Sequence, residues 1–246
     1  MIERLLPVAA SEHARAFDGV LWSVHAHMAL QALAWGVFFL ICLVRFRRGR
    51  NPEPSANGAG LVLPVVAIGA VIVGDAALLV GAAFPAWMAR SARPPLAEAL
   101  EIRVVAEQFA WNIQYPGPDG VFGSTSDALI SASNPLGIDR RDPNARDDIG
   151  ILNALTLPLG RPVIVHLSSR DVIHSFTLNE MRVKQDATPG VVVTMWFTPV
   201  KTGTWDIACS QLCGLGHYRM RGEYSVVTDE QWAAWLRQEL ALLQRR

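Results

Sequence analysis

The sequence has no net charge and very little cysteine. Its 246 residues contain 22 lysines and arginines against 22 aspartates and glutamates, so no basic excess indicates nucleic-acid binding. Of only three cysteines, Cys42 lies in an apolar run, where it is expected to act as a small apolar side chain, which leaves a pair near the C-terminus. The first twenty residues also lack the apolar core and cleavage site of a signal peptide. We therefore predict a short extramembrane arm over residues 1–20.

Two long apolar runs dominate the part of the chain that follows this arm. The first covers residues 22–44, and its 23 residues contain no charged side chain apart from two histidines. A helix of that length measures about 34 Å, enough to cross a hydrocarbon core of about 30 Å. A second run covers residues 61–85 and is interrupted by Asp75. The two runs predict a transmembrane helical hairpin over residues 21–90, with a turn-rich connection at residues 51–60.

The connection between the two runs carries four arginines and one glutamate. The positive-inside rule places it in the cytoplasm, so both termini are expected on the periplasmic or extracellular side of the cell membrane. Small residues on the second run, together with His27 and Gln31 on the first, predict packing against another membrane protein. Asp75 is expected either to form a hydrogen bond to a neighbouring subunit or to belong to a proton path.

After a linker at residues 91–100, the chain changes to short strands. Alternating β-branched and aromatic residues predict a strand over Glu101–Tyr115. Further strands, separated by turn residues, are predicted at residues 151–157, 162–168, 174–178, 191–197, 203–208 and 222–227. Evenly spaced strands of this kind indicate an all-β sandwich or barrel.

Two segments of the C-terminal part stand apart from the strands. Residues 116–150 are long, polar and rich in glycine, aspartate, asparagine and serine, which predicts a loop insertion. Thr228-Asp-Glu-Gln231 has the pattern of a capping box and predicts a C-terminal helix within residues 228–246. The apolar face of that helix is expected to pack on the domain through four residues: Trp232, Trp235, Leu236 and Leu240.

The chemically richest stretch is C-S-Q-L-C-G-L-G-H-Y-R-M at residues 209–220. Cysteine, histidine and methionine are ligands that bind copper, and a weak axial methionine is typical of copper sites. The two cysteines lie four residues apart, so two thiolates can bridge two copper ions. His174 and His217 would then cap one copper each. Met220 would be an axial ligand of one copper, and the backbone carbonyl of Gln211 would bind the other.

Three other interpretations of this motif stay open on the residues alone. Cys209 and Cys213 could form a disulfide bond on the oxidising side of a membrane. They could also form a zinc site together with His174 and His217. The histidines could instead be ordinary core residues. The methionine favours copper over zinc, because zinc does not use a thioether ligand.

Three segments resemble subunit II of the haem–copper cytochrome c oxidases: D-V-I-H-S-F at 171–176, R-V-K-Q-D-A-T-P-G at 182–190 and the cysteine motif at 209–220. In that family the motif forms the dinuclear copper (CuA) domain. The resemblance extends over nearly the whole chain, including the two apolar runs. It implies a membrane-anchored all-β fold, in which a two-helix transmembrane hairpin precedes a cupredoxin-like Greek-key β-barrel over residues 101–227 and a C-terminal helix.

The resemblance also implies a function. The chain would accept electrons from cytochrome c, or a similar donor, at a dinuclear copper centre. It would pass them to haem in subunit I, where oxygen is reduced and protons are pumped. No catalytic residue is expected in this chain, since the ligands leave no open position on either copper. The implied partners are subunit I, other oxidase subunits, the donor and membrane lipid, but no nucleic acid. The equivalent copper subunit of a nitric oxide reductase is the alternative, and a copper-delivery protein would need exchangeable ligands.

Several positions of the family pattern can be placed on this sequence. The tryptophan through which electrons enter in the family is matched by Phe109, so electrons are expected to enter through Phe109 or Trp111. Gln211 stands where many members have a glutamate that reaches magnesium or manganese, so that carboxylate is missing here. Three charged residues also match and are expected beside the ligands or at a subunit interface: Asp171, Lys184 and Asp186.

Overall fold

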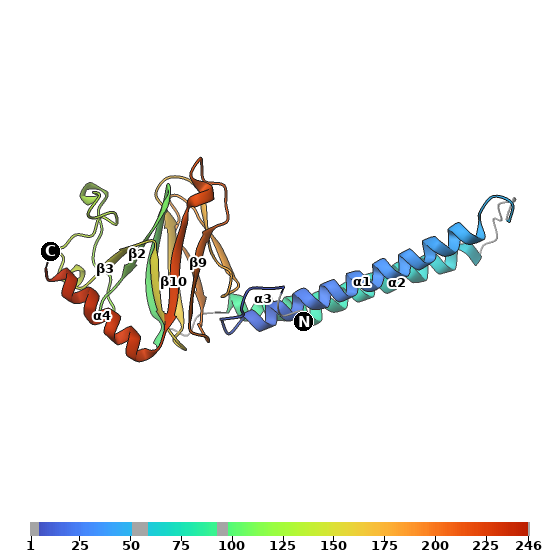
Figure 1. Cartoon of the computed structure of the whole chain (residues 1–246), viewed down its shortest axis with the longest axis horizontal. Helices are drawn as coiled ribbons and strands as arrows, with labels where there is room; N and C mark the ends of the chain where they lie inside the picture. The colour runs from blue at the N-terminus through green and yellow to red at the C-terminus, as the bar shows by residue number, and fades with distance from the viewer. Residues whose placement is uncertain (1–4, 51–58, 93–97, 246) are drawn as a thin grey trace. The chain divides into compact units, whose positions relative to one another are not determined.

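The structure, a computed structural model, describes residues 5–50, 59–92 and 98–245. The chain divides into two compact units (Figure 1). One unit is helical and comprises Arg15–Ala92. The other combines Met1–Ala14 with Arg93–Arg246 and contains all the described strands.

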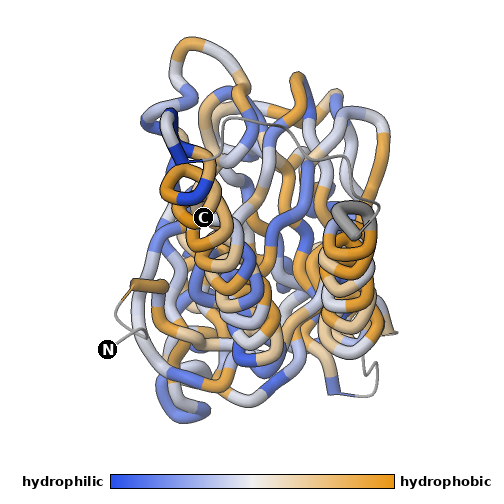
Figure 2. Tube along the Cα trace, turned by 90° about the vertical axis from the view of Figure 1, so that its right-hand side faces the viewer, coloured by the Kyte–Doolittle hydropathy of each residue, from blue (hydrophilic) through white to orange (hydrophobic). Residues whose placement is uncertain are grey.

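The helical unit is built from two long helical stretches. Its elements are α1 (Ala14–Arg45), α2 (Ala59–Leu78), the π-helical segment η2 (Leu79–Ala83) and α3 (Phe84–Ser91). Among the described residues, two stretches are long and apolar enough to cross a membrane, Ala14–Arg45 and Val62–Ser91. Figure 2 colours most turns of the helices in its foreground as hydrophobic (orange), with some hydrophilic (blue) turns among them. Hydrophobic side chains are stable when they face lipid or another membrane protein.

The borders of these helices differ from those expected. Helix α1 already begins at Ala14, so residues 14–20 of the predicted arm are helical, because the helix-favouring Ala-Arg-Ala-Phe run joins the apolar run directly. Residues 51–58 of the predicted connection lie outside the described residues, and Ala59 and Gly60 already belong to α2. Most of the predicted linker, residues 93–97, also lies outside them.

A polar contact joins α1 and α2. His27 Nε2 lies 3.0 Å from Asp75 Oδ1, and Gln31 Nε2 lies 2.7 Å from the same histidine nitrogen. Gly74 permits this approach, because a Cβ atom there would lie only 2.5 Å from His27 Cε1. Asp75 thus has a partner within its own chain, where the sequence predicted one in a neighbouring subunit or a proton path. Its side chain is still 61% exposed in this unit, so a further neighbour can reach it.

The other unit is a two-layer β-sandwich. Its ten strands are β1 (Leu100–Glu107), β2 (Ala110–Tyr115), β3 (Ile149–Leu152), β4 (Ala154–Pro158), β5 (Val163–Ser169), β6 (His174–Leu178), β7 (Val183–Ala187), β8 (Val193–Phe197), β9 (Gly203–Cys209) and β10 (Arg221–Val227). One five-stranded sheet has the order β3-β2-β1-β5-β8 and the other β4-β10-β9-β6-β7. The β1–β5 and β10–β4 pairs are parallel, and the others are antiparallel. The predicted cupredoxin-like class is confirmed.

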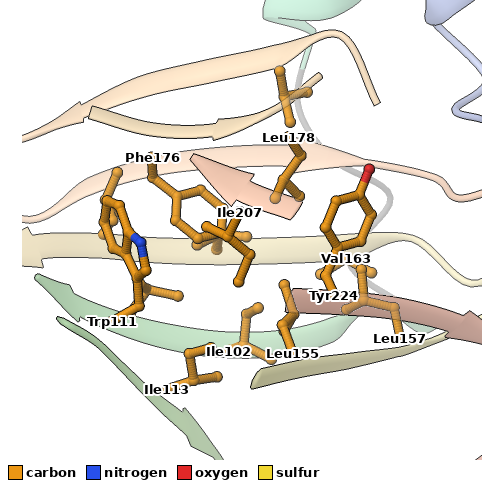
Figure 3. Packing of buried hydrophobic residues seen from close by; sticks show 14 of the residues in the cluster. Ile102, Trp111, Ile113, Leu155, Leu157, Val163, Phe176, Leu178, Ile207 and Tyr224 are labelled. Carbon is orange, nitrogen blue, oxygen red and sulfur yellow. The ribbon is translucent and has the colours of Figure 1, made fainter. Parts of the chain in front are cut away.

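The core lies between the two sheets (Figure 3). Alternate residues of β1 point inward, as its burial pattern shows, and Ile102 is completely buried. Phe176 and Ile207 face it from the second sheet, and both are also fully buried. Burying each such side chain stabilises the fold by about 1.5–3 kcal/mol. This packing holds the ends of β6, β9 and β10 in fixed positions.

Three strand predictions need correction. The single strand expected over Glu101–Tyr115 is the antiparallel pair β1 and β2, because the chain turns at Gln108–Phe109. The strand expected at 151–157 is divided at Asn153, whose φ of 56° lies in the left-handed region. Strand β7 was not predicted, because its sequence V-K-Q-D-A is mostly polar. It is an edge strand with only its end residues buried.

The predicted insertion at residues 116–150 contains two short 3-10 helices, η4 (Asp127–Leu129) and η5 (Pro143–Ala145). It has its own small apolar cluster of Leu136, Ile138 and Ala145. Helix α4 (Asp229–Leu243) begins as predicted with a capping box, in which Thr228 and Gln231 bond reciprocally. The four predicted apolar residues of α4 pack against the main core.

The N-terminal arm packs on the sandwich. The backbone N–H of Ala10 donates to Glu180 O at 2.8 Å, and Ser11 Oγ donates to Met181 O at 2.6 Å. Ala10 and Ser11 are almost completely buried. The chain just before α1 is therefore bound to the same domain that follows the helical unit in sequence.

Candidate metal centre

Three strand ends bring the predicted ligands together. His174 is the first residue of β6 and Cys209 the last of β9, and these neighbouring strands are antiparallel, with Phe176 opposite Cys209. The loop over residues 210–220 then leads into β10 and contains the short helix η6 (His217–Arg219). The ligands thus lie at one edge of a rigid sheet.

The two cysteines are free thiols that face each other. Their Sγ atoms are 3.8 Å apart, whereas a disulfide bond needs about 2.05 Å. Two metal–sulfur bonds of about 2.3 Å span up to about 4.6 Å, so one ion can bind both sulfurs. The carbonyl oxygen of Gln211 lies 3.3 Å from Cys209 Sγ, within reach of an ion bound there.

Both histidines turn their Nδ1 atoms toward sulfur. His174 Nδ1 lies 3.1 Å from Met220 Sδ and 4.0 Å from Cys209 Sγ. His217 Nδ1 lies 3.5 Å from Cys213 Sγ. Among the described residues, His174 and the two cysteines form a group whose ligand atoms all lie within 4.8 Å of one another. His217 is outside that group, and its nearest sulfur is that of Cys213 rather than that of Cys209.

Asp171 contacts the first of these histidines. Its Oδ1 lies 2.9 Å from His174 Nε2, and the other ring nitrogen, Nδ1, faces Met220 Sδ. A carboxylate behind a metal-binding histidine fixes the tautomer and orientation of its ring. His174 is completely buried, and the Trp111 ring lies beside it with a centroid distance of 6.2 Å.

Burial also sets the protonation of the metal-free site. Desolvation, together with the neighbouring Cys209 thiol, raises the pKa of Cys213 to about 11. Burial acts to raise the pKa of Asp171, but hydrogen bonds from His174 and from the N–H groups of Gln108 and Val172 hold it below its ordinary value. The metal-free cysteine is therefore a neutral thiol, and metal binding must release its proton.

The two aromatic residues through which electrons were expected to enter differ in burial. Trp111 is completely buried, whereas Phe109 is half-buried. The Phe109 ring packs on the ligand loop, because a Cβ atom on Gly216 would collide with it. Phe109 therefore lies between the ligand loop and solvent.

The three charged residues expected near the site lie in different places. Asp171 contacts a ligand, as described above. Lys184 and Asp186 are exposed on β7, where they pair with Thr177 and Ser175 of β6. Neither is in the group of side chains close enough to bind a metal.

Sequence reasoning missed Gln108. Its side-chain Nε2 donates to the carbonyl of Cys213 at 2.6 Å, and its backbone N–H donates to Asp171 Oδ2 at 2.7 Å. Both partners are more than 60 residues away in sequence, so the sequence around Gln108 does not indicate these contacts. Its position next to Phe109 was the one feature that could have drawn attention to it.

The donor set fits copper. Two thiolates, two imidazoles, one thioether and one carbonyl provide six donors, and thiolate and thioether sulfur are soft ligands. The near-complete burial of Cys213 and Met220 keeps water from the sulfurs. Together, the chain combines a cupredoxin-like sandwich, whose donors could hold a metal ion, with helices long and apolar enough to span a membrane.

Comparison with known proteins places this domain in a family. The family profile described as "Cytochrome C oxidase subunit II, periplasmic domain" matches residues 100–226. The chain therefore belongs to the cytochrome c oxidase subunit II family, a copper-binding subunit of an oxidoreductase complex.

Individual proteins are similar to this chain over different shares of its length. The chain is 36% identical over 204 residues to an alternative cytochrome c oxidase subunit 2 of Bradyrhizobium diazoefficiens, covering 82% of this chain and 73% of the relative. It is 32% identical over 149 residues to cytochrome c oxidase subunit 2 of Cereibacter sphaeroides, covering 56% of this chain and 48% of the relative. The crystal structure of the periplasmic domain of subunit II from Bradyrhizobium japonicum cytochrome oxidase is 28% identical, with a TM-score of 0.44, covering 62% of this chain and 98% of that one.

Proposed function

We propose that this chain is the electron-transfer subunit II of a cytochrome c oxidase and holds a dinuclear copper centre. The observation that carries the proposal is the pair of free thiols 3.8 Å apart, with one histidine Nδ1 beside each end of the pair. The bound coppers would supply one-electron transfer. The ligands are His174, Cys209, Cys213, His217, Met220 and the carbonyl of Gln211.

The protein's part is to keep these ligands still. Electron transfer is fast when gaining an electron moves few atoms. His174 and Cys209 sit on paired strands, and Asp171 fixes the His174 ring. Cys213 and Met220 are buried, so little water can reorganise around the sulfurs. These six donors would fill the coordination positions of the two coppers, so no catalytic step on a substrate is assigned to this chain.

Electrons would arrive from cytochrome c, or a similar donor, through Phe109. This residue lies between the ligand loop and solvent, whereas Trp111 is enclosed in the core. They would pass to haem in subunit I, where oxygen reduction and proton pumping take place. The relatives' names support oxygen as the acceptor over the nitric oxide reductase alternative.

The surface around the ligands supports a protein partner at this face. Three apolar side chains of the ligand loop are largely exposed: Leu212 at 76%, Leu215 at 97% and Tyr218 at 85%. We call these three residues the apolar rim. Exposed apolar side chains that cluster around a site mark interaction surfaces more often than scattered ones do.

The packing of the arm supports the proposed location. The chain just before α1 and the domain after α3 belong to one compact unit. This packing supports a hairpin with both ends on one side of the membrane, and the arginines at 45–50 favour the cytoplasm for the connecting end. The copper domain and both termini are assigned to the periplasmic or extracellular side.

Purification of the complex from its native membrane tests this function. We expect the chain to co-purify with a haem-bearing membrane subunit, and the complex to oxidise reduced cytochrome c while consuming oxygen. A haem complex that reduces nitric oxide but not oxygen would replace the proposal with its alternative. Isolation of the chain without any haem subunit would contradict both.

A further inference from the structure

One residue outside the ligand set connects both sides of the metal centre. The Gln108 side chain donates to the carbonyl of Cys213 at 2.6 Å, and its backbone N–H donates to Asp171 Oδ2 at 2.7 Å. The other oxygen of Asp171 lies 2.9 Å from His174 Nε2. A continuous hydrogen-bonded path therefore runs from one histidine ligand to the backbone of a cysteine ligand.

The ligand loop is shaped to fit this contact. Gly214 has a φ of +128°, which side-chain-bearing residues rarely adopt, and a Cβ atom there would lie 2.6 Å from Gln108 Nε2. The same Cβ atom would also lie 3.4 Å from the Phe109 ring. The positive φ favours glycine at this position, and a side chain there would have to displace the Gln108 amide from its contact with the loop.

Gln108 itself is exposed and is not part of the apolar core. Its side chain therefore has a polar role: the amide holds the carbonyl of a residue whose thiol faces Cys209. Without this donor, the loop carrying Cys213 and His217 keeps its covalent ends at β9 and β10 and its packing against Phe109, but loses this hydrogen bond to the β1–β2 turn. The position of Cys213 relative to His174 would then be less closely fixed.

We propose that Gln108 is a positioning residue that sets the location of Cys213 relative to His174. The inference rests on the proposed copper function. Through the hydrogen bond from Gln108 to Cys213, the β1–β2 turn would set the position of the Cys213 sulfur. That position would in turn affect how evenly two coppers share the unpaired electron and how slowly copper dissociates. Gln108 touches neither the metal nor the donor protein in this role.

The test uses the full-length chain in detergent, loaded with copper. Gln108→Met keeps the length and the backbone N–H but removes the amide donor. Gln108→Lys keeps an N–H donor at the end of a chain of similar length. Gln238→Met, at an exposed position on α4, is the matched control.

Three properties are measured for each variant. They are the EPR hyperfine pattern of the copper, the rate of copper loss to a chelator, and amide hydrogen exchange of residues 212–217 in the metal-free protein. We expect Gln108→Met to lose copper about tenfold faster, the lower end of the effect of outer partners on metal affinity. Its unpaired electron should be shared less evenly, and its loop amides should exchange faster. Gln108→Lys should lie nearer the wild type, and Gln238→Met should match it.

Two results would overturn the inference. One is a Gln108→Met variant with wild-type EPR, copper loss and amide exchange. The other is equal behaviour of the methionine and lysine variants, including equal failure to bind copper, since the donor would then be irrelevant. Both leave the proposed function intact if the wild type shows a shared copper signal. Absence of that signal in the wild type would instead contradict the proposed function.

Discussion

Asp171 Oδ1 lies 2.9 Å from His174 Nε2, and this contact points the opposite ring nitrogen of His174 at Met220 Sδ, 3.1 Å away. In the proposed copper site, this contact would leave Nδ1 as the histidine nitrogen that binds the metal. A half-exposed loop residue thus acts on a fully buried ligand.

Asp171→Ala tests this relationship. Without the carboxylate, the His174 ring loses its fixed tautomer and orientation, so copper affinity should fall about 10–100-fold. Competition against a copper chelator measures the affinity. Asp186→Ala, at an exposed position on β7, serves as the control and should leave it unchanged. Equal affinities for wild type and Asp171→Ala would show that Asp171 does not orient the ligand.

Phe109→Ala tests where electrons enter. The Phe109 ring packs on the ligand loop, so its removal should slow the reduction of the copper centre by the donor while the copper EPR signal stays the same. Stopped-flow absorbance measures that reduction. Phe122→Ala, within the insertion, provides an aromatic control. An unchanged rate would remove Phe109 from the path.

Leu215→Ser tests the apolar rim. The side chain is 97% exposed, so the change should not disturb the fold or the copper. Removing an apolar anchor from an interface typically weakens binding by about 1 kcal/mol or more, roughly fivefold. Turnover of the assembled oxidase should therefore fall, whereas Val121→Ser on the insertion should not change it. Normal turnover and assembly of Leu215→Ser would show that no partner contacts the rim.

Thr228→Ala tests the start of α4. Thr228 Oγ1 accepts the N–H of Gln231, and loss of such an N-cap lowers the free energy of unfolding by about 1 kcal/mol. Denaturant titration measures this change, with exposed Thr202→Ala as the control. Copper binding should be the same in both variants. An unfolding free energy equal to that of the wild type would mean that the cap contributes nothing.

Most of the proposed ligand set follows from local sequence. Five of the six donors lie within residues 209–220, so their spacing alone restricts where they can lie. His174 lies 35 positions before Cys209 and was proposed as a ligand from its residue type, and β6, which it begins, pairs with the strand that ends at Cys209. The strand pattern likewise predicted the sandwich, because alternating apolar residues reveal which face is buried.

Other features depend on contacts that sequence does not reveal. Gln108 binds residues 63 and 105 positions away, so nothing near it in the chain indicates its role. Strand β7 is stabilised by pairing with β6 rather than by its own polar residues. Asp75 finds His27, 48 positions away, because Gly74 lets the two helices approach. In each of these three cases, the contact joins residues far apart in sequence, and only the folded structure shows which residue is the partner.

EPR spectroscopy of the full-length, copper-loaded chain, with copper counted per chain, tests the central claim most directly. We expect two coppers per chain and a hyperfine pattern from one unpaired electron shared by two copper nuclei. A single zinc or copper ion per chain, or a signal confined to one copper nucleus, would contradict the account.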